Sequence, residues 1–161
     1  MNAHFQSFVN LIRNPLRFRY FLLQKLPAAF FVGLRIVHLD AQKCIVKVQY
    51  NWFTKNPFKS MYFAVEAMAA ELSTGLIVFG QTYQRQPKIS MLVSKMEASF
   101  FKKAIGKIIF TCEDGLAIQN AIQKAITDKE GQTITCVSEG HNEAGELVAR
   151  FQFTWTVKEK N

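Results

Sequence analysis

One stretch, Asn56 to Gly75 with the LIVFG that follows it, limits what this chain can fold into. It opens with Asn-Pro, a pair typical of a turn, and continues after Lys59 as an apolar segment whose only charged residues are Glu66 and Glu71. At 100° per residue, its large apolar side chains fall on one stripe: Met61, Val65, Met68, Leu72, Leu76 and Phe79. The stretch therefore predicts a long helix that packs on the core.

The two glutamates of this helix differ in their surroundings. Glu66 lies roughly opposite the apolar stripe, which predicts a solvated residue. Glu71 lies among Ala64, Ala67 and Gly75, where small side chains leave room for a ligand or another backbone, and where desolvation would raise the carboxyl pKa. Glu71 is therefore the candidate for chemistry. The alternative is a buried acid satisfied by a hydrogen bond at a dimer interface.

The segments around this helix alternate as strands do. The last strand is the clearest, because six apolar side chains face one way at period 2: Leu147, Ala149, Phe151, Phe153, Trp155 and Val157. We predict strands at about 31–39, 43–50, 89–101, 107–112, 132–140 and 146–158, paired two by two along the chain. A shorter helix is predicted after Asp114 and ends before Gly131. The fold class is therefore α+β, with an antiparallel sheet against the apolar helix.

Residues 1–28 are predicted to form an N-terminal helical arm. One helix covers about 4–12, and Asn14-Pro15 starts a second that runs to about Leu26. The basic residues of the second helix lie among aromatic residues, which also fits a helix on a membrane surface. We favour the interpretation that this amphipathic helix covers the sheet, and we expect no membrane contact. The whole chain, 1–161, is interpreted as one domain, with its core at 31–158.

The net charge of +8, from 20 basic and 12 acidic side chains, favours anionic partners. A basic surface that only confers solubility is the alternative. The sequence has no basic recognition helix or aromatic RNA-binding signature, so we expect no nucleic acid partner. The three cysteines and three histidines show no ligand spacing, so no metal site is predicted. Isolated cysteines and the lack of a signal-peptide pattern favour a cytoplasmic location.

This layout resembles the hotdog fold, in which a curved antiparallel sheet wraps a central helix. Thioesterases of the phenylacetate-pathway (PaaI) type carry a motif that starts with Asn. A Gly follows three positions after the Asn, and a His-Gly-Gly begins six positions after it. An acidic residue stands nine positions after the His. Counting from Asn56, this chain has Lys59 at the Gly, Tyr62-Phe63-Ala64 at the His-Gly-Gly, and Glu71 at the acid. Two segments resemble still more closely the branch known as domain of unknown function 4442. They are NPFKSMYFAVEAMAAELSTG and the closing HNEAGELVARFQFTWTVK.

The resemblance implies a thioesterase for acyl-CoA or acyl carrier protein, with CoA as part of the substrate and no separate cofactor. It implies Glu71 as base or nucleophile, Asn56 as the group that orients the carbonyl or the water, and the backbone near Tyr62 and Phe63 as an oxyanion hole. It also implies a homodimer, or a dimer of dimers, in which the acid comes from the partner subunit.

Three alternatives remain open. The missing His-Gly-Gly motivates a second hypothesis, a non-catalytic binder of fatty acids or acyl-CoA. Asn56 is also a suitable turn or cap residue, and Tyr62 is also a suitable packing residue at the rim of a site.

Overall fold

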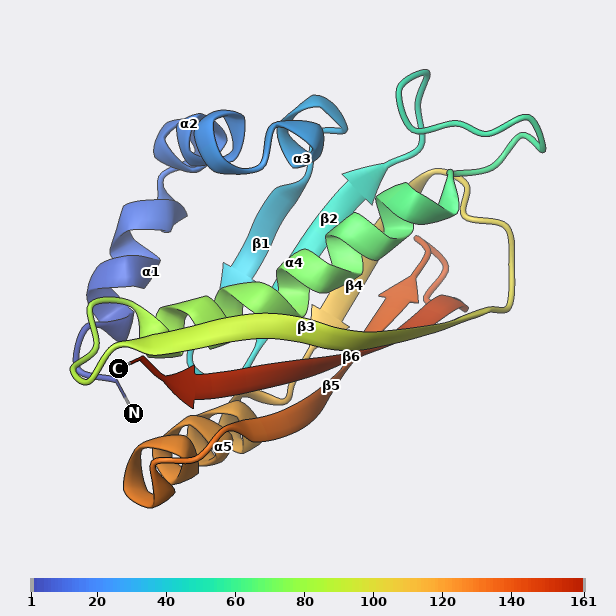
Figure 1. The fold of residues 1–161 in the computed structure, drawn as a ribbon. Coiled ribbons are helices and arrows are strands. Elements are labelled where there is room, and N and C mark those ends of the chain that lie inside the picture. Colours follow the sequence, from blue (N-terminus) through green and yellow to red (C-terminus); the bar gives the residue numbers. More distant parts are fainter. Residues whose placement is uncertain (1, 161) are drawn as a thin grey trace.

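A sheet of six antiparallel strands curves around a central helix in the computed structural model, which describes residues 2–160 (Figure 1). The helices are α1 (Phe5–Arg13), α2 (Pro15–Lys25), α3 (Pro27–Phe31), α4 (Phe63–Thr82) and α5 (Gly115–Asp128). The strands are β1 (Arg35–Leu39), β2 (Cys44–Gln49), β3 (Ile89–Phe100), β4 (Lys107–Cys112), β5 (Gln132–His141) and β6 (Leu147–Glu159). The predicted α+β class, with a curved sheet around a long helix, is confirmed.

The central helix α4 lies along one face of the sheet and contacts five of its strands, β2 to β6 (Figure 1). Most of its side chains are buried, including Val65, Leu72 and Leu76 of the predicted stripe. The stripe is corrected at its two ends, because Met61 precedes the helix and Phe79 is 38% exposed. Among residues 2–160, α4 is the helix long and apolar enough to cross a membrane. However, 67% of its most apolar window is buried inside the protein, as expected of a core helix.

The sheet order is β1-β2-β4-β5-β6-β3, with antiparallel neighbours throughout. The predicted alternation of β6 is confirmed, since Phe151, Trp155 and Val157 are buried. The predicted pairs β1/β2 and β5/β6 are also confirmed. The predicted pair β3/β4 is wrong, because β3 pairs with β6 and β4 lies between β2 and β5. Alternation specifies the buried face of a strand but not its partner.

Three predicted boundaries are also corrected by the structure. The helix α4 begins at Phe63, and the Asn-Pro turn continues as a loop up to Tyr62. Phe31 ends the short helix α3 instead of starting a strand. The helix α5 ends at Asp128, and the residue that stops it is Lys129, with φ of 55°, and not Gly131.

The arm of α1, α2 and α3 packs beside α4 and β1 (Figure 1). Asn14 caps α2 as predicted, because its side chain accepts hydrogen bonds from the amides of Leu16 and Arg17. Asn2 ties the start of the arm to the end of α4 by donating to the carbonyl of Gly80 at 3.0 Å. A Cβ at Gly80 would lie 2.6 Å from the ring of Phe5, so only glycine allows this close approach.

Candidate functional site

Two cavities open along α4, one at its N-terminus and one beside its middle. The first has a volume of about 570 Å³ and is lined by the loop 56–63, Glu66 and the segment 100–104. The second has a volume of about 380 Å³ and is lined by Glu71 and Gly75 of α4, by Met91 of β3 and by the C-terminal end of α2. The predicted site residues are therefore divided between two places in one chain.

The N-terminus of α4 has unsatisfied donors. Tyr62 occupies the N-cap position but provides no side-chain cap. The amide N–H groups of Phe63 and Ala64 donate to no residue within the described part of the chain. Free amides and the positive end of the dipole of a 20-residue helix favour an anion at this position.

The role predicted for the Tyr62 backbone needs a correction. The amide N–H of Tyr62 donates to the carbonyl oxygen of Thr54 at 2.7 Å, so it is already occupied. The ring of Tyr62 packs edge-on against that of Phe63, with centroids 4.9 Å apart, and both rings are exposed. The pair of amides available for an oxyanion is therefore Phe63 and Ala64, and Tyr62 forms part of the rim.

Asn56 shapes the turn that precedes α4. Its side-chain amide donates to the hydroxyl of Ser60 and to the carbonyl of Met61, both at 3.0 Å. Its side-chain oxygen accepts from the amides of Phe58 and Ser60, at 2.9 and 3.2 Å. Both polar atoms are therefore used within the turn, as the alternative interpretation of Asn56 requires.

Lys59, which stands where the family motif has glycine, adopts a left-handed conformation with φ of 58°. Glycine adopts this conformation without steric cost, whereas a lysine side chain is strained in it. The turn thus keeps the backbone that a glycine would favour, which supports the register counted from Asn56.

Glu71 borders the second cavity beside small and aromatic neighbours. A Cβ at Gly75 would lie 3.0 Å from Oε1 of Glu71 and 3.2 Å from the ring of Trp155, so the missing side chain makes room for both. Trp155 is held in place by donating from its indole nitrogen to the hydroxyl of Thr74 at 3.1 Å. No residue within 2–160 donates a hydrogen bond to the Glu71 carboxylate, and burial raises the pKa of Glu71.

Glu66 is buried and not solvated, which corrects the sequence prediction. Its side chain is 4% exposed, and its Oε2 has no hydrogen-bond partner within the described residues. The loop before α4 and the segment 100–104 cover this part of the helix, an effect that a helical wheel cannot include. Burial raises the pKa of Glu66 from 4.5 to about 7.

The protonation of Glu66 predicts a pH-dependent stability. Below pH 4.5 the carboxyl is neutral in the folded and unfolded states. Between 4.5 and about 7 only the unfolded chain ionises, so stability falls as pH rises, and above about 7 the loss is complete. The shift corresponds to about 3 kcal/mol. Glu66→Gln should therefore remove about that much of the difference in unfolding free energy between pH 4 and pH 8, measured in urea.

The exposed Glu130→Gln is the control for this prediction, and it should leave the pH dependence of stability as in the wild type. Equal pH dependence in Glu66→Gln and the wild type would contradict the assignment of a raised pKa to Glu66.

Among residues 2–160, no group of three or more His, Cys, Asp or Glu side chains is placed to hold a metal ion. The three cysteines are free and buried, and burial raises the pKa of each thiol. Buried neutral thiols of this kind are inert.

Solved structures define the class to which this fold belongs. A protein of unknown function from Pseudomonas aeruginosa, PA5026, described as a probable thioesterase, is 20% identical with a TM-score of 0.76, covering 91% of this chain and 97% of that one. The thioesterase SAV0944 from Staphylococcus aureus is 16% identical with a TM-score of 0.63, covering 86% and 98%. The thioesterase HI1161 from Haemophilus influenzae is 14% identical with a TM-score of 0.62, covering 85% and 86%. The chain therefore has the hotdog fold.

The chain belongs to the family described as Domain of unknown function (DUF4442), whose model matches residues 16–157. The predicted resemblance is thereby confirmed, and the match includes α2 of the arm as well as the core. No curated protein matches the sequence.

Proposed function

We propose that the protein is a thioesterase that hydrolyses acyl-CoA or acyl carrier protein thioesters, with Glu71 as its base or nucleophile. The observation that carries the proposal is the Glu71 carboxylate, which has no partner within residues 2–160, a pKa raised by burial, and an apolar cavity beside it. Carboxylates with raised pKa values in clefts are typical of acid-base sites.

The chemistry would proceed at the start of α4. As a base, Glu71 would take a proton from water while the water oxygen bonds to the thioester carbon. The amides of Phe63 and Ala64 would donate to the oxyanion that forms. The C–S bond would then break, the thiolate would leave and take up a proton, and the carboxylic acid product would remain. Asn56 would act as a positioning residue through the turn that presents these amides.

The reaction requires a second subunit. Glu71 lies eight residues after Phe63 on α4, about 12 Å along the helix axis, so one chain does not bring the acid to its own free amides. The outer edge of β3 pairs with no strand in the described residues and carries apolar side chains, including Leu92, which is 69% exposed. Such an edge is a ready template for a second strand. A homodimer joined through β3, or a dimer of such dimers, would complete the site.

The spacing of the two polar residues also supports the proposal. In structures of the Staphylococcus aureus protein SAV0944, a glutamine and a glutamate fifteen positions apart were each replaced with alanine. Asn56 and Glu71 are separated by the same number of positions. In this chain the first residue supports a turn and the second borders a cavity.

Thiol release from acyl-CoA esters tests the proposed function. The purified protein should release CoA from at least one member of a panel that ranges from acetyl-CoA to palmitoyl-CoA, at rates that saturate with substrate. The same acyl groups attached to acyl carrier protein would show which of the two carriers the protein prefers. Release no faster than the uncatalysed rate across both panels would contradict the proposal.

A non-catalytic acyl-CoA binder is the second candidate function. It is favoured by the side chains of Tyr62 and Phe63, which stand where related thioesterases have histidine and glycine and which add bulk beside the free amides. Tight binding of acyl-CoA in calorimetry without thiol release would establish this function in place of hydrolysis.

A further inference from the structure

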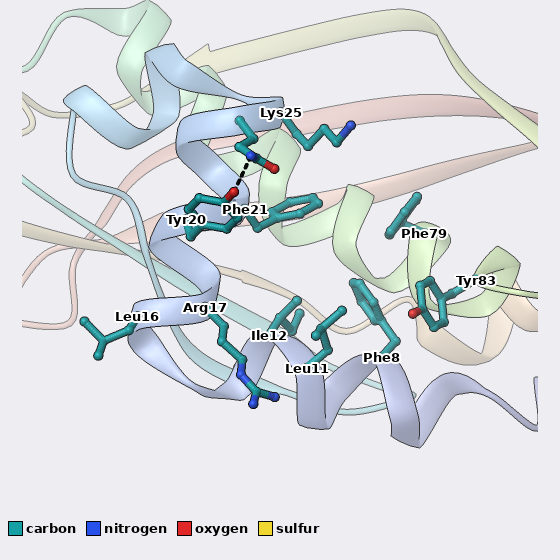
Figure 2. A pocket seen from close by; sticks show the side chains of 11 residues that line it. Phe8, Leu11, Ile12, Leu16, Arg17, Tyr20, Phe21, Lys25, Phe79 and Tyr83 are labelled. Carbon is teal, nitrogen blue, oxygen red and sulfur yellow. Dashed lines mark hydrogen bonds between the residues drawn. The ribbon is translucent and has the colours of Figure 1, made fainter.

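An apolar groove separates the N-terminal arm from α4, and we call it the arm groove (Figure 2). Its volume is about 500 Å³, and its walls come from α1, α2 and the C-terminal end of α4. Figure 2 shows the rings of Phe8, Phe21 and Phe79 gathered between the helices. The rings of Phe8 and Phe79 meet edge-on with centroids 5.3 Å apart. This volume is in the range of small-molecule sites.

The arm groove lies next to the cavity that Glu71 lines. Phe21, Lys25 and Phe79 line both cavities, so the two share a wall and a boundary. Glu71 lines the second cavity, whereas the arm groove is lined by side chains of α1 and by Tyr83. The two adjacent cavities follow α4 from Glu71 to Tyr83, and we call them together the passage.

The length of this passage suits an acyl chain. Glu71 and Phe79 are eight residues apart on α4, which is about 12 Å along the helix. An extended chain gains about 1.2 Å per covalent bond, so this distance accommodates roughly ten carbons. Tyr83 lies one further turn along the helix, which extends the limit by a few more carbons.

The charges around the passage fit an anionic thioester. The cations that line the arm groove are Arg17 and Lys25, and Figure 2 shows their charged ends lying away from the cluster of rings. No aspartate or glutamate precedes Asp40 in the sequence. Lys25 also lines the Glu71 cavity, so it places a positive charge at the carbonyl end, where the phosphate-bearing carrier of the acyl chain would leave the protein.

Resting on the proposed function, we infer that the arm groove binds the acyl chain of the substrate, with its carbonyl at Glu71 and its methyl end toward Phe8 and Tyr83. The arm then sets the chain length that the protein accepts. Each methylene buried in the groove should strengthen binding about fourfold. Affinity should stop rising beyond roughly ten to fifteen carbons, where the passage ends.

Leu11→Trp tests the inference, because Leu11 lines the arm groove but not the Glu71 cavity. Leu11 is 42% exposed, so the larger ring can be accommodated without disrupting the core. The control is Leu23→Trp, since Leu23 is 46% exposed on the same arm and lines neither cavity. Circular dichroism would verify that both variants are folded.

Binding of non-hydrolysable thioether analogues of acyl-CoA, from butyl to hexadecyl, would be measured by calorimetry. In the wild type and Leu23→Trp, affinity should rise with chain length to the expected limit. In Leu11→Trp, the rise should stop several carbons earlier, with at least a tenfold loss for the dodecyl analogue and little change for the butyl one.

The outcomes separate this inference from the proposed function. The same chain-length profile in Leu11→Trp and Leu23→Trp would overturn the inference, even if the protein hydrolyses thioesters. Binding with the expected profile but without hydrolysis of acyl-CoA would uphold the inference and overturn the enzymatic proposal. Free fatty acids that bind as tightly as the thioethers of equal length would overturn the assignment of a thioester as the occupant.

Discussion

Replacing Glu71 with glutamine is expected to lower kcat/KM for the preferred acyl thioester by about 10² to 10⁴-fold. Glutamine keeps nearly the same shape but can neither accept the proton of water nor attack the carbonyl. The change also removes a buried ionisable group whose pKa is raised by burial, so the variant should be at least as stable as the wild type near pH 8. Thiol release measured with the wild type and the variant in parallel tests the prediction.

The pH profile adds a second expectation for Glu71. A base works only when ionised, so kcat/KM of the wild type should fall as pH drops through the pKa of Glu71, which lies above its ordinary value of 4.5. Glu130→Gln, on the exposed surface, is the matched control and should retain both the rate and the profile. Full activity in Glu71→Gln would remove Glu71 from the mechanism.

Replacing Phe63 with proline is expected to slow hydrolysis by about 10² to 10³-fold relative to Phe63→Ala. Both variants lose the aromatic ring, but only proline also removes the amide N–H that would donate to the oxyanion. Proline is favoured at the first position of a helix. The preceding residue, Tyr62, has φ of −70° and ψ of 130°, which proline tolerates. The fold of α4 should therefore persist.

The comparison of the two Phe63 variants isolates one hydrogen-bond donor. Single-turnover rates for the same acyl-CoA would separate the chemical step from binding. Substrate affinity should be similar in the two, because the oxyanion forms only in the transition state. Equal single-turnover rates for Phe63→Pro and Phe63→Ala would show that the start of α4 does not stabilise the oxyanion.

The sequence predicted the fold where local patterns carry the information. The alternation of β6 reflects the burial of one face, which the order of residues records directly. The length and apolar character of α4 also predicted a core helix, although the helix is buried on several sides and not only along the predicted stripe. Strand partners are different, because the paired residues of β3 and β6 are 49 to 70 positions apart in the sequence and no local signal identifies that partner. A short connection from β3 to β4 suggested a hairpin that does not form.

The candidate site was predictable only in part, for a similar reason. The small residues around Glu71 indicated a close approach, and Gly75 provides it beside Trp155. The burial of Glu66 depends on a loop and a segment that are distant in sequence, so periodicity placed it in solvent. The occupied amide of Tyr62 depends on the carbonyl of Thr54, a loop contact without a sequence pattern. The arm groove arises from packing between helices far apart in the chain.

Mixing Glu71→Gln with Phe63→Pro tests most directly the claim that each site combines the acid of one subunit with the helix start of its partner. In a mixed dimer, one site would join the intact Glu71 of one subunit to the intact Phe63 amide of the other. After unfolding and refolding together in equal amounts, half of the dimers should be mixed, and activity should recover to about a quarter of the wild type. Activity no higher than the mean of the two separate variants would contradict a site shared between subunits.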